Sequence, residues 1–202
     1  MSFKAYYNKY LESSKLHVKN IMEYGPATPF GYPEPLPEQV KRIEFITSHA
    51  EGLVLDMGSD SGYVLNSCRG GFGIDISLLR IKASKHFFPD LDLVQATAEH
   101  LPFQKETFDT VICAELLEHV LNPETVLNEA HAVLKSSGKL IVTVPDEIRG
   151  KSHLNPEHLR KFDEGELRNL LNRLFDIKNI EYIEGDYPAW CVCSLKSEVL
   201  WN

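Results

Sequence analysis

The sequence predicts an α/β domain built on an open, mostly parallel, seven-stranded sheet with helices on both faces and an antiparallel hairpin at one edge. After residue 50, apolar runs of strand length alternate with segments of helical pattern, as in parallel strands joined by crossover helices. Runs such as "FDTVICA" and "KLIVTV" are almost continuously apolar, which is typical of strands buried on both faces. The expected strands are 53–57, 71–76, 91–96, 108–114, 139–144, 175–184 and 191–197.

Composition and charge restrict the class of protein. The chain has 202 residues, 43% of them apolar, and a formal net charge of −8, which suits one globular domain. An acidic surface argues against non-specific binding of phosphate backbones, so nucleic acid is not the expected partner. No apolar run approaches the roughly 18 residues of a membrane span, and the N-terminus lacks a signal-peptide core. The four cysteines lack zinc-finger spacing. We therefore expect a cytoplasmic protein with reduced thiols and no membrane partner.

The first 50 residues differ from the rest. Residues 1–24 have a helical pattern rich in tyrosine, and prolines then recur over residues 26–37, which prevents regular structure. A second helix is expected over 37–50. We therefore divide the chain into a helical and proline-rich arm or lid, residues 1–50, and a main domain, residues 51–202. The apolar residues that fit the second helix are Val40, Ile43, Phe45 and Ile46.

Two helices of the main domain have clear sequence boundaries. The first is expected over 123–135, because Asn122 can cap it, Pro123 suits its first position and "SSG" can end it. The second is expected over 163–174 and begins at the capping candidate Asp163.

A glycine-containing loop follows the first expected strand. In "GLVLDMGSDSGYVL", residues 52–65, the strand stops at Asp56, and Gly58 and Gly62 follow. Ligands of open parallel sheets bind beyond the carboxyl ends of the strands, where this loop lies. A P-loop is excluded because no lysine follows Gly62, and the dinucleotide pattern G-x-G-x-x-G is incomplete. The remaining class is an adenosine-type ligand without a pyrophosphate.

A second acid supports that class of ligand. Asp75 ends the next strand, and a carboxylate there can accept hydrogen bonds from both hydroxyls of a ribose. In the alternative interpretation, Asp75 caps the following helix and Asp56 is a turn residue. Acids at the ends of two successive strands favour the nucleoside site.

With these residues in place, the chain resembles the class I S-adenosylmethionine (SAM)-dependent methyltransferases. "LVLDMGSDSG" is similar to the first motif of that family, D-x-G-x-G-x-G, and "GIDIS" is similar to its ribose motif. "ATAEHLPFQKETFDTVICAELLEHV" and "VLKSSGKLIVTVP" are similar to later motifs in the same order. The resemblance is greatest to the small-molecule branch that includes the ubiquinone-biosynthesis O-methyltransferases. It implies a Rossmann-like doubly wound fold, an enzyme, and SAM as the cofactor.

The resemblance also implies roles for single residues. The family usually has an aspartate where Thr97 stands, and a threonine hydroxyl would accept a hydrogen bond from the adenine more weakly. The residues expected around SAM are Asp56, Gly58, Ser59 and Gly62 at the methionine end, Asp75 at the ribose, Ile76, Thr97 and Ala98 at the adenine, and Cys113 and Glu115 beside the transferred methyl group.

Asp60 departs from the family pattern because it replaces the middle glycine of the first motif. Aspartate tolerates a left-handed backbone better than most residues. We favour a role for its side chain as the cap of a helix that begins near Ser61. Alternatively, it faces the positive charges of SAM, or the cofactor site is weakened and the chain is a catalytically impaired, cofactor- or partner-binding relic.

The segment "AELLEHVLN", residues 114–122, carries the candidate catalytic groups. As a helix, it would place Glu115, Glu118, His119 and Asn122 on one face. His119 could then act as a general base held by a neighbouring carboxylate. Alternatively, the two glutamates and the histidine could bind a divalent metal that acidifies a substrate hydroxyl.

The pattern E-x-x-E-H also occurs in metal-assisted relatives, namely the ubiquinone-pathway enzymes and the RNA 3′-terminal 2′-O-methyltransferases. In the latter, a further histidine comes from the loop after the fifth strand, where this chain has His153 and His158. The pattern is also common in relatives without a metal.

The sequence thus predicts SAM-dependent methyl transfer to a small-molecule acceptor, most simply at oxygen. The alternatives are the binding relic and a metal-assisted RNA 2′-O-methyltransferase. Aromatic residues outside the core motifs either recognise an apolar or cationic acceptor or merely anchor the arm. They are Tyr6, Tyr7, Tyr10, Phe30, Tyr32, Tyr187 and Trp190.

Overall fold

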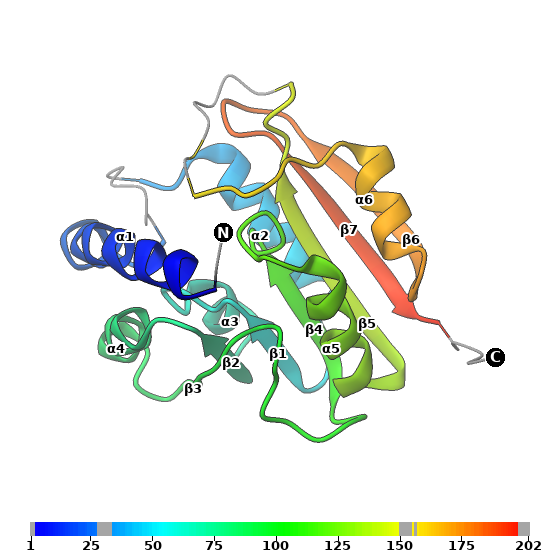
Figure 1. Cartoon of the computed structure of the whole chain (residues 1–202), viewed down its shortest axis with the longest axis horizontal. Helices are drawn as coiled ribbons and strands as arrows, with labels where there is room; N and C mark the ends of the chain where they lie inside the picture. The colour runs from blue at the N-terminus through cyan, green and yellow to red at the C-terminus, as the bar shows by residue number, and fades with distance from the viewer. Residues whose placement is uncertain (1–2, 28–33, 150–154, 156, 198–202) are drawn as a thin grey trace.

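The computed structural model describes residues 3–27, 34–149, 155 and 157–197, which form one seven-stranded sheet flanked by helices (Figure 1). The strand order is β3-β2-β1-β4-β5-β7-β6. Strands β1 to β5 are parallel, and β7 is antiparallel to both β5 and β6. This confirms the predicted fold class. The strands are β1 (Val54–Met57), β2 (Phe72–Asp75), β3 (Asp92–Gln95), β4 (Phe108–Ala114), β5 (Leu134–Pro145), β6 (Phe175–Ile183) and β7 (Ala189–Lys196).

Two apolar layers hold the helices on the sheet. Alternation along the central strands sends Val111 and Val142 into the layer under α5 and α6, and Ile112 and Ile141 into the layer under α2 and α3. The near-continuous apolar runs in the sequence therefore supply buried side chains to both faces of the sheet. The helices are α1 (Phe3–Tyr24), α2 (Pro37–His49), α3 (Tyr63–Ser67), α4 (Leu78–Phe87), α5 (Pro123–Val133) and α6 (Glu164–Leu171).

The predicted caps of α5 and α6 are present, but α5 ends earlier than expected. The Asn122 side chain accepts a hydrogen bond from the Thr125 amide, and Asp163 caps α6. Leu134 is fully buried and already pairs with Phe108 of β4, so the backbone is extended from that residue on. The "SSG" that was expected to stop the helix lies within β5.

The inner face of α2 differs from the apolar face expected from the sequence. Phe45 and Ile46 are buried as predicted, whereas Val40 is 43% exposed. The first turns of the inner face carry two buried charged residues instead, Glu38 and Arg42. Both lie beside polar groups rather than on the sheet, which explains why an apolar pattern did not reveal them.

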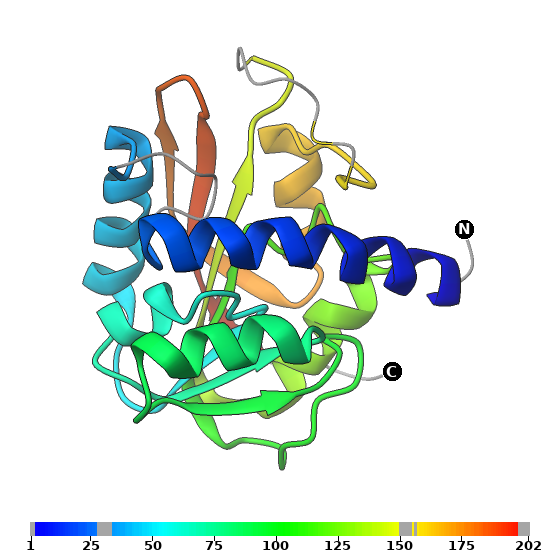
Figure 2. The same ribbon diagram turned by 90° about the vertical axis from the view of Figure 1, so that its left-hand side faces the viewer.

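Helix α1 lies alongside α4, across the carboxyl ends of the parallel strands (Figure 2). Much of the proline-rich segment, including Phe30 and Tyr32, falls outside the described residues. Among the helices that the structure describes, none is both long enough and apolar enough to cross a membrane.

Candidate functional site

A cavity of about 750 Å³ lies at the carboxyl ends of β1, β2 and β4. Strands β2 and β4 lie on opposite sides of β1, so the strand order reverses here, and ligands of open α/β sheets bind at such a point. Residues of α1 and α2 form part of its wall. The volume is within the range of small-molecule sites.

Asp56 carries an unpartnered carboxylate oxygen into this cavity. The residue lies near the end of β1 and is 2% exposed, and its Oδ2 has no hydrogen-bond partner among the described residues. Burial, reinforced by the carboxylates of Asp60 and Asp75, raises the pKa of Asp56 to about 7. A cationic ligand group in the cavity would therefore find a carboxylate oxygen that no described residue engages.

The backbone of the loop after β1 is held by β2. The amides of Gly58 and Ser59 donate to the Ile74 carbonyl at 2.9 and 2.8 Å. Both residues line the cavity, whereas Gly62 does not. Gly62 has a φ of 76°, and a Cβ there would collide with Ser84 Oγ, so glycine is needed where the loop passes α4. The structure thus gives Gly62 a packing role, and its predicted contact with SAM stays a prediction.

Asp75 is held by two backbone amides at the end of β2. Its Oδ1 accepts from Ser77 at 2.7 Å, and its Oδ2 accepts from Asp60 at 3.1 Å. Each oxygen keeps a second lone pair, and the residue lines the cavity. Burial raises the pKa of Asp75 to about 6, against the opposing effect of Arg80. Ser77, not Asp75, caps α4, so the alternative role of Asp75 as a helix cap is wrong.

The neighbouring strand ends place most of the other predicted residues at the cavity. Cys113 is the exception, because it is fully buried with its thiol 3.8 Å from Met57 Sδ, in the layer under α5. Side chains alternate along β4, so Ala114 points to the opposite face from Cys113. Ala114 and Glu115, the residue after the strand, form the cavity wall here. The structure therefore places Cys113 outside the lining of the cavity, and its contact with SAM stays a prediction. The residues expected around the adenine, all of which line the cavity, are Ile76, Thr97 and Ala98.

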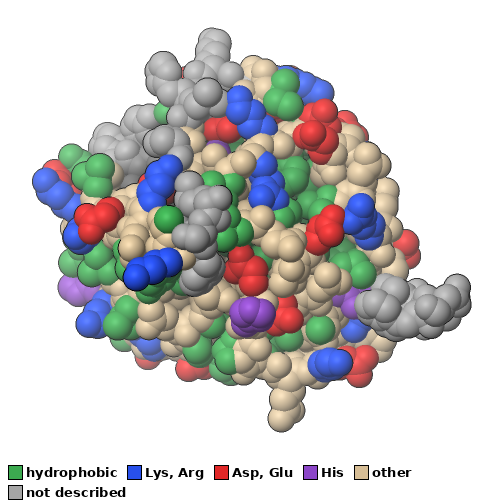
Figure 3. Space-filling model, viewed as in Figure 1, with side chains coloured by type: hydrophobic (Ala, Val, Ile, Leu, Met, Phe, Trp, Pro, Cys, Tyr) green, Lys and Arg blue, Asp and Glu red, His purple; other side chains and the backbone are tan. Residues whose placement is uncertain are grey.

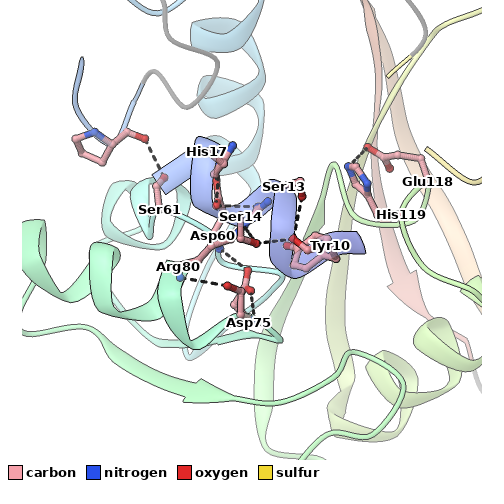
Figure 4. Close-up of polar contacts among 12 residues, drawn as sticks. Tyr10, Ser13, Ser14, His17, Asp60, Ser61, Asp75, Arg80, Glu118 and His119 are labelled. Carbon is pink, nitrogen blue, oxygen red and sulfur yellow. Dashed lines mark hydrogen bonds and ion pairs between the residues drawn. The ribbon is translucent and has the colours of Figure 1, made fainter. Parts of the chain in front are cut away.

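Asp60 joins the loop to two helices (Figure 4). Its φ is 46°, a left-handed backbone, and its carboxylate lies 2.8 Å from His17 Nε2 of α1 and 3.0 Å from Arg80 Nη1 of α4. Burial alone would raise the pKa of Asp60, but His17 and Arg80 lower it well below its usual range. Helix α3 begins at Tyr63 with Gly62 at its N-cap and no side-chain cap, so the favoured role of Asp60 as a cap is wrong.

Arg80 and the loop together hold α1 over the cavity. Arg80 Nε donates to the Ser14 hydroxyl at 3.1 Å, and the guanidinium carbon lies 4.5 Å from the centre of the Tyr10 ring. The Ser61 hydroxyl donates to the Pro26 carbonyl at 2.8 Å, just after α1 (Figure 4).

Residues 115–122 form turns rather than the predicted helix, and this divides the candidate catalytic stripe. The Glu115 amide donates to the Thr143 carbonyl at 2.9 Å, so strand pairing continues past β4 and no helix can begin there. The Glu115 carboxylate accepts from the Thr143 hydroxyl and pairs with Arg42 of α2, both at 2.8 Å. Asn122 instead caps α5.

Glu118 and His119 lie together beside His158. Burial, with a contribution from Glu115, raises the pKa of Glu118 well above its usual range. Burial and His158 lower the pKa of His119 to about 3, so its ring is neutral at pH 7. His158 Nδ1 lies 2.7 Å from Glu147 Oε1. All four side chains line the cavity, and His153 lies outside the described residues.

Four charged residues of the site were not singled out in the sequence. Arg42 lies three residues before Phe45 and four before Ile46, so it shares their face of α2. A basic residue on the inner face of a helix is unusual, and this signal could have revealed Arg42 from the sequence. His17, Arg80 and Glu147 act through contacts between distant segments and have no comparable local pattern.

Comparison with known proteins supports the family resemblance. A profile described as a methyltransferase domain matches residues 55–142. A probable SAM-dependent methyltransferase of Mycobacterium tuberculosis is 29% identical over 126 residues, which cover 58% of this chain and 46% of that protein. An uncharacterized protein of Methanocaldococcus jannaschii is 35% identical over 144 residues, which cover 70% of this chain and 60% of that protein. Residues 55–142 thus match a methyltransferase domain, and the chain is similar to the class I SAM-dependent methyltransferases.

The resemblance to the ubiquinone branch is present but distant. The ubiquinone biosynthesis O-methyltransferase of Photobacterium profundum is 32% identical over 127 residues, which cover 56% of this chain and 53% of that protein. A chain of the complex between the Trm112 methyltransferase activator and a methyltransferase of Haloferax volcanii has the same fold, with a TM-score of 0.74 over 100% of both chains at 15% identity. The chain spans about half to three fifths of the length of the curated relatives it matches, 60% and 46% for the two above.

The buried carboxyl of Asp56 should make the stability of this chain depend on pH. We expect the free energy of unfolding of the ligand-free chain to fall, relative to that of an Asp56→Asn variant, as the pH rises from about 4 to about 7. In this window the folded chain holds a proton that the unfolded chain has lost, because the pKa is about 7 when folded and near 4 when unfolded. The slope is at most about 1.4 kcal/mol per pH unit.

Urea unfolding of both proteins between about pH 5 and pH 8 measures this difference. Comparison with the variant cancels the opposing effect of His119, whose lowered pKa favours the folded state as the pH rises. The difference should level off above about pH 7. A difference that stays constant over the whole range would mean that Asp56 ionises normally.

Proposed function

We propose that this chain transfers the methyl group of SAM to an oxygen of a small-molecule acceptor. One observation carries the proposal: the same cavity contains two buried carboxylates at successive strand ends, Asp56 and Asp75, and a neutral imidazole, His119, near the end of β4. In this proposal, Asp56 with the loop residues Gly58 and Ser59 holds the methionine end of SAM, and Asp75 holds the ribose. The match to a methyltransferase domain supports SAM as the cofactor.

SAM supplies an activated methyl group, so the chain mainly has to orient the acceptor and exclude water. His119 is neutral at pH 7 and can accept a hydrogen bond from an acceptor hydroxyl. Its low pKa makes it a weak base, so we assign it to orientation of the hydroxyl more than to removal of the proton. Glu115, paired with Arg42, carries no proton-transfer role in this proposal.

A small acceptor fits the arrangement better than RNA does. The cavity is roofed by α1, and we propose that residues 1–50 include a lid that the contacts of Asp60 and Arg80 hold in place. On the face shown in Figure 3, Lys and Arg side chains lie singly among acidic and apolar ones. With a net charge of −8, that distribution is unlike the continuous basic surface of RNA-binding proteins.

Calorimetric titration of the full chain with SAM, and then with its demethylated product, tests the enzyme against a partner-binding relic that has lost the cofactor site. We expect saturable binding of about one equivalent of either compound. We also expect an Asp60→Asn variant to retain binding, because that carboxylate is engaged by His17 and Arg80. An absence of heat with both compounds for the folded wild-type chain would favour the relic.

A further inference from the structure

We propose that Glu118, His119 and His158 bind a divalent transition-metal ion at the wall of the cavity. The first two lie in the loop after β4, and His158 lies in the segment after β5. The two segments are joined by a hydrogen bond from the Leu159 amide to the Glu118 carbonyl at 2.8 Å. One candidate ligand atom from each of the three side chains lies within 4.8 Å of the other two.

Glu118 is the strongest indication of a missing cation. It is 1% exposed, and neither of its carboxylate oxygens has a hydrogen-bond partner among the described residues. Its closest basic neighbour is His119, whose Nε2 lies 4.0 Å from Oε1, too far for a hydrogen bond (Figure 4). His119 Nδ1 is also buried without a partner among the described residues. Buried carboxylates are costly unless they are paired or coordinate a metal.

His158 is already oriented as a ligand would be. Its Nδ1 lies 2.7 Å from Oε1 of Glu147, whose side chain is 3% exposed. A carboxylate on one ring nitrogen fixes the tautomer and presents the other nitrogen, as is usual for metal-binding histidines. The rings of His119 and His158 are 4.6 Å apart, centre to centre, and inclined at 81°, so both can reach one ion.

The spacing requires only a modest closure around an ion. Bonds of about 2.0–2.2 Å from a tetrahedral ion would bring the ligand atoms to roughly 3.4 Å from one another. The candidate ligand atoms are at most 4.8 Å apart, so small rotations of the side chains would bring them to this spacing. The ligands would come from turns and a loop rather than from one rigid helix, which makes such rotations easy.

The donor set indicates the type of metal. Two imidazoles and one carboxylate suit Zn²⁺, Mn²⁺, Fe²⁺ or Co²⁺, whereas Mg²⁺ and Ca²⁺ prefer oxygen ligands alone. Glu115, the first acid of the E-x-x-E-H pattern, is excluded because it pairs with Arg42 at 2.8 Å and that guanidinium would repel a cation. Three protein ligands leave a coordination position open toward the cavity. Resting on the proposed function, that position would take the acceptor oxygen, and His119 would then orient the acceptor through the ion in place of a direct hydrogen bond.

Titration of Zn²⁺, Co²⁺ and Mg²⁺ into the chelator-treated full chain tests the site, by calorimetry and, for Co²⁺, by its visible absorption. We expect one equivalent of Zn²⁺ or Co²⁺ to bind and Mg²⁺ to bind far more weakly. Glu118→Gln should weaken Zn²⁺ binding by more than roughly 100-fold and abolish the Co²⁺ absorption, since loss of an outer partner alone costs roughly 10- to 100-fold. Glu147 is such an outer partner of His158, so Glu147→Gln should weaken Zn²⁺ binding by roughly 10- to 100-fold.

Glu115→Gln is the matched control, since it removes the other acid of the same pattern. We expect it to weaken Zn²⁺ binding by less than about tenfold, because Glu115 supplies no ligand and acts on the ion only through the charges of Arg42 and Glu118. Equal losses in Glu115→Gln and Glu118→Gln, or no binding of Zn²⁺ and Co²⁺ by the wild type, would overturn the proposal. His158→Gln provides a second ligand variant if thermal unfolding shows that Glu118→Gln is misfolded. SAM titration without metal keeps the two proposals separate, because SAM binding does not require the ion.

Discussion

Replacement of Asp75 by asparagine should weaken SAM binding by about 100-fold or more. Hydrogen bonds to a charged group each contribute about 1.5–3 kcal/mol, and this carboxylate is proposed to accept two from the ribose. Asparagine keeps the shape but offers one acceptor oxygen in place of two. Because both oxygens already receive backbone amides, from Ser77 and Asp60, the new NH₂ group would also face a donor. Calorimetry with SAM measures the loss.

The control for this variant is Asp92→Asn, which removes an exposed acid at the start of β3, the neighbouring strand. We expect it to bind SAM like the wild type. Far-UV circular dichroism and thermal unfolding must show that the Asp75→Asn chain is folded before its affinity is compared. If folded Asp75→Asn bound SAM as tightly as Asp92→Asn, the ribose role of Asp75 and the orientation of SAM in the cavity would both be wrong.

The parts of the molecule that local sequence determines were predicted well. Strands β4 and β5 are apolar on both faces, and that pattern has few structural solutions besides a central parallel strand. The cap at Asn122 depends on a neighbour three residues away, so its sequence signal is local too. Asp56 and Asp75 were found because each ends a strand of a parallel sheet, and such ends meet at one edge.

The wrong predictions concern side chains whose surroundings come from distant segments. Asp60 was expected to cap the nearest helix, but His17, 43 residues away in sequence, and Arg80 compete for its carboxylate. The stripe around Glu115 was expected to be helical, but the pairing with Thr143 of β5 outweighs the apolar periodicity of the segment. The local sequence around Asp60 and Glu115 contains no pattern from which these distant partners could be predicted.

Gly71, just before β2, should be among the residues whose replacement costs the most stability. Its φ is 142°, a region that is almost exclusive to glycine, and a Cβ there would lie 2.5 Å from the carbonyl oxygen of Val54 in β1. Backbone strain and overpacking each cost about 1–3 kcal/mol, so Gly71→Ala should lose roughly 3–5 kcal/mol of unfolding free energy. That is a large fraction of the about 5–15 kcal/mol that stabilises a typical domain. Urea unfolding followed by circular dichroism measures it.

Gly70→Ala is the matched control because the two glycines are adjacent and both have a positive φ. Gly70 has a φ of 98°, and a Cβ there would have no atom within 4 Å, so its replacement should cost only about 1–2 kcal/mol of strain. The difference between the variants thus isolates the contact of Gly71 with β1. Since β1 carries Asp56 and β2 carries Asp75, a forced separation of these strands should also weaken SAM binding in Gly71→Ala but not in Gly70→Ala. Equal losses of stability in the two variants would show that backbone conformation alone, and not the close approach of the strands, selects glycine at this position.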